Sequence, residues 1–200
     1  MEVVFDIGNV LLSWDPRNLF AAEFAHEAER ELFLSSALDM AFILQTDIAR
    51  SFGELIEARA AAFPAYAREL RMFDARWIET LGGAIEENVA LLRRLQAGGA
   101  RVHALSNFAH EKFALACAEF PFLNTFDIAV ISGRERVAKP DRRIFEILIE
   151  RVGRPPGDLL FVDDSLRNVE AARACGIEAL HYAPGLDLAR EFAVRGLIAS

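Results

Sequence analysis

The strongest constraint on the fold of this chain is a series of short apolar runs that alternate with helical patterns. The runs are rich in β-branched residues and cover residues 2–5, 102–105, 128–131, 159–162 and 177–182. Continuous apolar runs of this length are typical of parallel strands that are buried on both faces. Between them lie helical patterns, such as Ile144, Leu148 and Val152 before Gly153, which indicate βαβ units. The sequence therefore predicts an α/β fold with a mostly parallel sheet.

A long insertion separates the first predicted strand from the rest of the sheet. Roughly seventy residues show no strand pattern and carry many aromatic residues among charges. Ser51 followed by Glu54 matches a capping box, which predicts the start of a helix. We expect the aromatic side chains to form the core of a helical cap rather than a ligand cage. The predicted architecture is a three-layer, Rossmann-like core of residues 1–13 and 84–200, with an α-helical cap of residues 14–83.

Charge and hydropathy argue against several classes of function. The formal net charge of −8 would repel a phosphate backbone, so nucleic acid is not an expected partner. No eighteen consecutive residues are apolar, and no basic segment precedes an apolar stretch at the N-terminus, so we expect a cytoplasmic protein that does not enter a membrane. Cys117 and Cys175 are far apart and are expected to be buried free thiols. The oligomeric state stays open between monomer and homodimer.

Polar residues follow three of the predicted strands at the point where each strand ends. Asp6 follows the first strand, Ser106 and Asn107 follow the second, and Asp163 and Asp164 follow the fourth. Because ligands bind at the carboxyl ends of parallel strands, we expect these side chains to meet at one edge of the sheet. Each residue alone is a weak signal, since an aspartate at a strand end is often only a helix cap. The ordered set is a much stronger indication of a site.

The residue types in this set predict a particular chemistry. Three neighbouring carboxylates repel one another unless a cation neutralises them, and oxygen ligands of this kind are preferred by Mg²⁺. Lys139, just before a helical pattern, adds a fixed positive charge, and Ser106 adds a hydroxyl donor. Together these two groups can hold the oxygens of a phosphoryl group. A carboxylate facing the phosphorus can then attack it and form an aspartyl-phosphate.

The same motifs show that the chain resembles the haloacid dehalogenase superfamily over nearly its whole length. The segments that carry the resemblance are Phe5-Asp6-Ile7-Gly8-Asn9-Val10-Leu11, Ala104-Leu105-Ser106-Asn107, Ala138-Lys139-Pro140-Asp141 and Phe161-Val162-Asp163-Asp164-Ser165-Leu166-Arg167-Asn168. The insertion matches the position of the helical cap in one subfamily. The first motif and the nearby segment 14–17 look most like a bacterial branch that includes sugar-phosphate phosphatases such as α-glucose-1-phosphate phosphatase. The resemblance therefore implies a hydrolase of a small phosphorylated metabolite, with a sugar phosphate as one candidate.

The resemblance also implies a role for each matching residue. Asp6 would be the nucleophile. The residues implied to bind Mg²⁺ are Asp6, the carbonyl of Gly8, Asp163 and Asp164, with Asp163 acting directly or through water. Ser106 and Lys139 would hold the phosphate and assist catalysis, and Asn107 would add a donor. Asn168 falls where the family often has an acid.

One departure from the family pattern concerns the proton donor. Most phosphatases of the superfamily have a second aspartate two residues after the nucleophile, as general acid and base. This chain has Gly8 there, so another group, a water or an easily displaced leaving group must compensate, and slow turnover is expected. Asp15 could be recruited, but a loop carboxylate near a cap hinge is more often structural.

Two other functions remain as alternatives at this stage. In a 2-haloacid dehalogenase the same Asp6 would displace halide without a metal, but the pair Asp163 and Asp164 would then repel the carboxylate substrate. A binding module that has lost turnover is a further alternative, against which the completeness of the other motifs argues. The cap decides the substrate, and the residues that we single out as candidates to contact the leaving group are Trp14, Arg50, Arg59 and Trp77.

Overall fold

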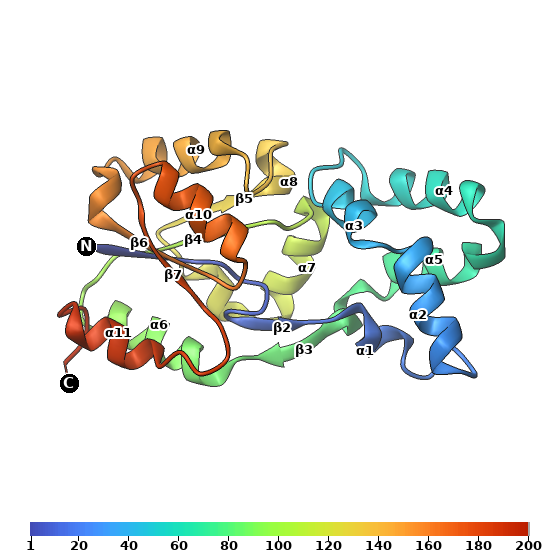
Figure 1. Cartoon of the computed structure of the whole chain (residues 1–200), viewed down its shortest axis with the longest axis horizontal. Helices are drawn as coiled ribbons and strands as arrows, with labels where there is room; N and C mark the ends of the chain where they lie inside the picture. The colour runs from blue at the N-terminus through green and yellow to red at the C-terminus, as the bar shows by residue number, and fades with distance from the viewer. Residues whose placement is uncertain (200) are drawn as a thin grey trace.

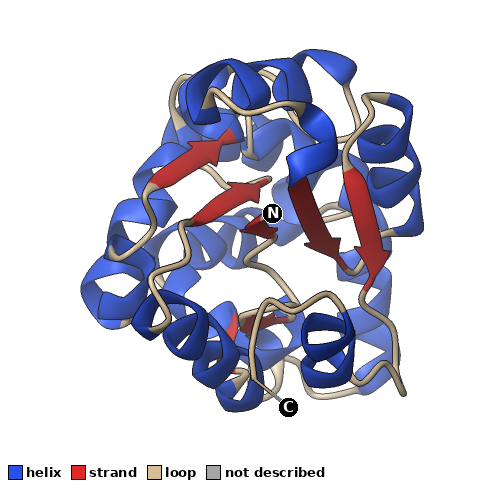
Figure 2. Cartoon of the chain, turned by 90° about the vertical axis from the view of Figure 1, so that its left-hand side faces the viewer, coloured by secondary structure: helices blue, strands red, loops and turns tan. Residues whose placement is uncertain are grey.

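A computed structural model describes residues 1–199 and contains a five-stranded, fully parallel sheet at its centre (Figure 2). Its strand order is β5-β4-β1-β6-β7. The strands are β1 (Glu2–Phe5), β4 (Val102–Ser106), β5 (Ile128–Ile131), β6 (Leu159–Asp163) and β7 (Glu178–His181). Each of the five predicted runs forms one of these strands, with ends that shift by at most one residue. The prediction of an α/β fold with a parallel sheet is confirmed.

Helices cover both faces of this sheet (Figure 1). Successive residues of β1 point to opposite faces, so Val3 and Phe5 contact one apolar cluster and Val4 contacts the other. The cluster around Val4 includes side chains from α9 (Arg142–Val152) and α10 (Leu166–Ala174). The opposite cluster includes side chains from α6 (Glu86–Ala97), α7 (His110–Glu119) and α11 (Leu188–Val194). This arrangement is the three-layer core that the sequence predicts.

The insertion forms a group of short helices beyond one end of the sheet, at the right of Figure 1. They are α1 (Pro16–Phe20), α2 (Glu27–Ser36), α3 (Met40–Thr46), α4 (Phe52–Ala62) and α5 (Ala67–Ala75). The Ser51 hydroxyl accepts a hydrogen bond from the Glu54 N–H at 3.2 Å, so the predicted start of α4 is confirmed. Phe20 and Phe33 are fully buried with ring centroids 4.9 Å apart. These two aromatic residues therefore belong to the core of the cap, as predicted, whereas Phe73 and Trp77, although buried, also line a cavity.

The expectation that the insertion contains no strand is wrong at both of its ends. β2 (Leu12–Trp14) and β3 (Leu81–Ala84) pair antiparallel in a separate two-stranded sheet that joins the cap helices to the core. These strands have only three and four residues, and β3 reads Leu-Gly-Gly-Ala, so neither shows a periodic apolar pattern. The domain boundaries at 13/14 and 83/84, which fall within this sheet, stay predictions.

The remaining elements are short connections. One is α8 (Ser132–Glu135), and four are 3₁₀ turns: η1 (Pro64–Tyr66), η2 (Trp77–Thr80), η3 (Pro121–Asn124) and η4 (Pro156–Asp158). Cys117 and Cys175 are free thiols, but both are only partly buried, unlike the expectation. Within residues 1–199, none of the helices has the length and apolar character needed to cross a membrane.

Candidate active site

Asp6 lies at the carboxyl end of the central strand and is almost fully buried. The Ile7 N–H donates to Asp6 Oδ1 at 2.7 Å, and the Lys139 ammonium lies 2.9 Å from the same oxygen. Burial raises the pKa of the Asp6 carboxyl, and the charge of Asp163 adds to this rise, whereas Lys139 and the Ser106 hydroxyl favour the ionised form.

Lys139 reaches the site from the segment before α9 and is fully enclosed. Its Nζ donates to the Leu105 carbonyl at 3.0 Å and to Asp163 Oδ2 at 2.7 Å, in addition to its ion pair with Asp6. Burial alone would lower the pKa of Lys139, but the charges of Asp163 and Asp6 outweigh this effect and raise it. Lys139 is therefore a permanently charged group between two buried carboxylates.

Two aspartates at the end of β6 differ in their surroundings. Asp163 is fully buried and accepts hydrogen bonds from the Ser165 N–H at 2.8 Å and from Asn168 Nδ2 at 3.0 Å. Its oxygens are thus already engaged by Lys139, Ser165 and Asn168. Asp164 is more exposed, and burial, followed by the charge of Asp163, raises the pKa of its carboxyl. Asp164 is the carboxylate of the pair that is freer to take a new ligand.

The three carboxylates form a cluster that fits a hard divalent cation. Asp6, Asp163 and Asp164 each have an oxygen within 4.8 Å of the oxygens of the other two. Lys139 alone cannot neutralise three carboxylates. Burial raises the pKa of both Asp6 and Asp164, and the charge of Asp163 adds to this rise. An all-oxygen donor set of this kind suits Mg²⁺. The chemistry of the donors therefore fits the cofactor that the sequence predicts, with Asp6 and Asp164 as the most available ligands.

Ser106 is the last residue of β4 and lies beside Asp6, and Asn107 follows it and lies beside Lys139. Ser106 is buried, and its hydroxyl hydrogen-bonds to Asp6. Asn107 Nδ2 donates to the Lys139 carbonyl at 3.0 Å, and the Lys139 N–H donates to Asn107 Oδ1 at 2.7 Å. Both polar atoms of the Asn107 side chain are thus used to fix the backbone of Lys139. Its amide positions the lysine, and because Asn107 also lines the cavity, the substrate contact that the sequence predicts stays a prediction.

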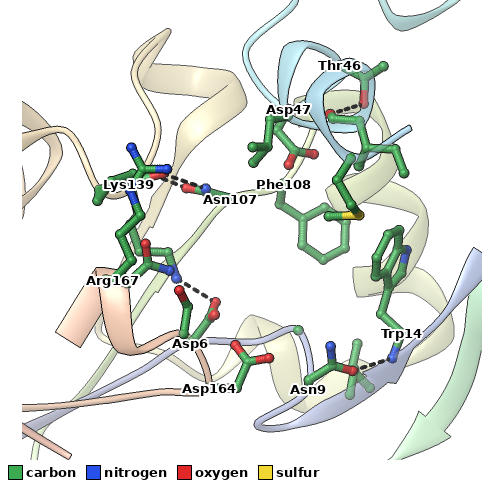
Figure 3. Close-up of a pocket in the computed structure, with 18 of the residues that line it drawn as sticks. Asp6, Asn9, Trp14, Thr46, Asp47, Asn107, Phe108, Lys139, Asp164 and Arg167 are labelled. Carbon is green, nitrogen blue, oxygen red and sulfur yellow. Dashed lines mark hydrogen bonds and ion pairs between the residues drawn. The ribbon is translucent and has the colours of Figure 1, made fainter. Parts of the chain in front are cut away.

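A cavity of about 340 Å³ opens above these residues, between the sheet edge and the cap (Figure 3). Asp6, Gly8, Lys139 and Asp164 line its floor, together with Arg167 of α10. Its walls and roof are mainly apolar, with side chains from β2, the cap helices and Phe108. The candidate site is therefore a charged floor under an apolar chamber.

The cap residues singled out from the sequence divide into two groups. Trp14 and Trp77 line the cavity, and Trp77 also packs on Phe108 with ring centroids 5.2 Å apart. Arg50 and Arg59 do not line it. Arg59 instead donates to the Ser36 and Ala37 carbonyls at 2.7 and 2.8 Å, so its guanidinium holds the cap together.

Asp47 is a cavity residue that sequence reasoning missed. It follows α3 directly, and its carboxyl points into the cavity from the cap side (Figure 3). Burial raises the pKa of Asp47 to about 7, and the charge of Asp6 adds to this effect, against the opposing influence of Lys139 and of the Ala109 N–H. By contrast, Asp15 is the N-cap of α1 and accepts from the Arg17 N–H at 2.8 Å, which makes it structural, as expected.

The loop after Asn107 is packed tightly against Gly133 of α8. A Cβ atom on Gly133 would lie 2.3 Å from the His110 nitrogen and 2.8 Å from the Phe108 oxygen, both backbone atoms. We expect Gly133→Ala to lower the free energy of unfolding by about 1–3 kcal/mol because the loop must move. Gly157→Ala is the matched control, since nothing lies within 4 Å of a Cβ there. Equal urea midpoints for the two variants would contradict this prediction.

The chain is similar in sequence to a known protein family and to individual known proteins. A sequence profile described as haloacid dehalogenase-like hydrolase matches residues 3–176. The chain is 30% identical over 102 residues to the sesquiterpene phosphatase astK of Aspergillus oryzae, covering 51% of this chain and 52% of that protein. It is 30% identical over 91 residues to the drimenol cyclase drtB of Aspergillus calidoustus, covering 46% of this chain and 17% of that protein. The chain thus matches about half of the phosphatase and a small part of the cyclase.

A solved structure shares the arrangement of almost the whole chain. It is the HAD family enzyme bt-2542 from Bacteroides thetaiotaomicron, in complex with magnesium and inorganic phosphate. The TM-score is 0.75 with 22% identity, and the alignment covers 96% of this chain and 98% of the other. At this level of identity the likeness shows a common fold.

Proposed function

Because this chain belongs to the haloacid dehalogenase-like hydrolases, we propose that it is a magnesium-dependent phosphatase with Asp6 as its nucleophile. The observation that carries the proposal is the buried contact between Asp6 and Lys139 beside a cluster of three carboxylates. The likeness to an enzyme crystallised with magnesium and phosphate supports the same assignment.

The chemistry follows from the position of these groups. The Asp6 carboxylate would attack the phosphorus of a phosphate monoester bound on the cavity floor, while Lys139 neutralises the charge of the phosphate oxygens and Ser106 helps to orient them. Asp6, Asp164 and Asp163 would hold Mg²⁺, which would supply charge neutralisation for the phosphate and for the carboxylates themselves. The aspartyl-phosphate on Asp6 would then be hydrolysed to release phosphate.

Dehalogenation is disfavoured by the same cluster. A 2-haloacid carries its own carboxylate, and it would have to approach three carboxylates, Asp6, Asp163 and Asp164, whose charge the two cations Lys139 and Arg167 offset only in part. Hydrolysis of a phosphate ester with a bound cation avoids this repulsion. The number of acidic groups therefore favours the phosphatase.

The walls of the cavity favour an apolar leaving group over a sugar. Ile43, Trp77 and Phe108 surround the space above the floor. A sugar would need several hydrogen-bonding groups from the cap, whereas the cap side chains with polar groups that line the cavity are Thr46, Asp47 and the two indoles Trp14 and Trp77. The Thr46 hydroxyl is already used, since it donates to the Ile43 carbonyl at 2.7 Å. We infer that the substrate is the monophosphate of an apolar alcohol, and the resemblance to a sesquiterpene phosphatase supports this class.

Helix α3 adds a second argument for an apolar substrate. Met40 and Leu44 line the cavity and yet remain 56% and 42% exposed. Exposed apolar side chains at the edge of a cavity gain free energy when an apolar ligand covers them. A sugar would leave them in contact with water or with its hydroxyl groups.

The proposal is tested by measuring phosphate release from geranyl phosphate, glucose 1-phosphate and p-nitrophenyl phosphate, with roughly 5–10 mM Mg²⁺ or with EDTA. We expect release that depends on Mg²⁺, and a kcat/KM at least about tenfold higher for geranyl phosphate than for the sugar phosphate. Metal-independent halide release from 2-chloropropionate in a parallel assay would favour the dehalogenase instead. A preference for the sugar phosphate would refute the substrate class while leaving the phosphatase intact.

Two variants test whether the cap is the source of the preference for an apolar substrate. We expect Leu44→Gln to reduce kcat/KM for geranyl phosphate about tenfold and to leave that for p-nitrophenyl phosphate nearly unchanged. Leu32→Gln is the matched control because Leu32 is 58% exposed on α2 and does not line the cavity. If both substitutions reduced kcat/KM for geranyl phosphate equally, the contact of Leu44 with the cavity would not explain the substrate preference.

A further inference from the structure

The proposed reaction needs a proton donor that the motif around Asp6 does not supply. When the bond between phosphorus and the ester oxygen breaks, the leaving alkoxide must be protonated, because an alkoxide is a poor leaving group in water. Gly8 has no side chain that could do this. The question is which other group of the cavity can reach the leaving oxygen.

The cavity has three carboxyl groups among its lining residues, and they have different surroundings. Asp6 and Asp164 belong to the acidic cluster at the floor. Asp47 stands apart from the cluster, on the cap side of the cavity and across the space from Asp6 (Figure 3). A substrate whose phosphate rests on the floor has its ester oxygen directed toward the apolar chamber, and hence toward the side where Asp47 lies.

The backbone of Asp47 is fixed to the core of the protein. Ser132 Oγ donates to the Asp47 carbonyl at 2.8 Å and accepts from the Phe108 N–H at 2.8 Å. The Arg136 guanidinium donates to the Ile48 carbonyl at 3.1 Å. These contacts tie the end of α3 to the loop that follows β4, and the Ala109 N–H of the same loop hydrogen-bonds to the Asp47 carboxyl, so this carboxyl is held over the floor.

We propose that Asp47 is the catalytic acid and base of this site, supplied by the cap in place of the side chain that Gly8 lacks. This inference rests on the proposed phosphatase function. Asp6 forms a bond to phosphorus, the bond from phosphorus to the ester oxygen breaks, and that oxygen takes the proton of the Asp47 carboxyl to leave as the alcohol. The Asp47 carboxylate then takes a proton from the water that attacks the aspartyl-phosphate, so phosphate is released and both carboxyl groups return to their starting states.

The environment of Asp47 suits this role. Its burial, with the added effect of the Asp6 charge, keeps its pKa near neutral, so the carboxyl can both hold and release a proton near pH 7. A carboxyl with an ordinary pKa would be ionised almost completely and could not act as an acid.

The open space at Gly8 allows a direct test of whether Asp47 takes the place of a carboxyl at that position. No atom lies within 4 Å of a Cβ built on Gly8, and its backbone is outside the left-handed region, so a side chain can be added there without strain. Gly8→Asp would place a carboxyl two residues after the nucleophile, next to the floor of the same cavity.

The experiment compares kcat/KM for geranyl phosphate and p-nitrophenyl phosphate in wild type, Asp47→Asn and the double variant Asp47→Asn with Gly8→Asp. We expect Asp47→Asn to lose about a hundredfold or more with geranyl phosphate and only a few-fold with p-nitrophenyl phosphate, because nitrophenolate leaves without a proton. The double variant should recover at least about tenfold with geranyl phosphate. Asp15→Asn, which also removes one carboxylate near the cap, should match wild type with both substrates.

Other results would overturn the inference. An equal loss with both esters would mean that Asp47 acts on binding or structure, and an unchanged kcat/KM would remove it from the reaction. A double variant no faster than Asp47→Asn would contradict the claim that the two positions serve one proton transfer. If wild type releases phosphate from neither ester, the proposed function fails instead. Thermal unfolding of each variant checks the fold, which we expect to survive because Ser132 binds the Asp47 backbone rather than its side chain.

Discussion

Asp6→Asn is expected to abolish phosphate release while leaving the protein folded. An amide oxygen is a far weaker nucleophile than a carboxylate, and removal of a nucleophile that works with its neighbours costs roughly 10⁴-fold or more in kcat. The substitution keeps the shape of the side chain and its contact with the Ile7 N–H. The measurement is phosphate release at saturating substrate, together with circular dichroism and thermal unfolding.

The stability of this variant gives a second, independent readout. Asp6 is buried beside Asp163, and both burial and that neighbouring charge disfavour its ionised form. Loss of the charge therefore relieves repulsion, while Lys139 keeps its contacts with Asp163 and the Leu105 carbonyl. We expect the free energy of unfolding to change by no more than about 1 kcal/mol.

Asp15→Asn is the matched control for Asp6→Asn. Asparagine is as good an N-cap as aspartate, so α1 should keep its start and the activity should stay at the wild-type level. Residual turnover of Asp6→Asn near the rate of this control, with an intact fold, would exclude Asp6 as the nucleophile.

The sheet and the residues at its edge were predictable because their signals are local. Each buried strand is a short apolar run, and Asp6, Ser106 and Asp163 stand at the ends of three such runs. The topology of a parallel sheet brings these ends to one edge, so their proximity follows from the strand pattern without any knowledge of side-chain packing.

The contribution of the cap to the site could not be predicted from local sequence signals. Asp47 follows a seven-residue helix with no motif around it, and its approach to the site depends on the contact of its carbonyl with Ser132, 85 residues later. The role of Asn107 was also hidden, because a side chain at a strand end can turn to a ligand or to a neighbouring backbone. Only the fold shows that both of its polar atoms bind Lys139.

Lys139→Met is the second substitution for which we expect a large effect, on both stability and activity. It removes the cation between Asp6 and Asp163, which are both buried, and leaves the two carboxylates without compensation. Removal of one partner from a buried ion pair costs about 3–5 kcal/mol, so unfolding in urea with EDTA present should show a loss of that size. With geranyl phosphate and p-nitrophenyl phosphate alike, kcat/KM should fall about 10²–10³-fold, with KM raised, because the phosphate oxygens lose a fixed positive charge.

A second substitution separates these two effects. Asp163→Asn removes one of the carboxylates that Lys139→Met leaves unpaired, and asparagine can still accept from the Ser165 N–H. We therefore expect Lys139→Met with Asp163→Asn to regain much of the lost stability, as a double-mutant cycle would report, but none of the activity. Recovery of both together would mean that Lys139 serves only to hold the fold. If Lys139→Met alone lost stability but kept its kinetics unchanged, Lys139 would likewise take no part in the chemistry. Because Lys139 lies between the nucleophile and Asp163, we expect the double variant to regain stability without regaining turnover.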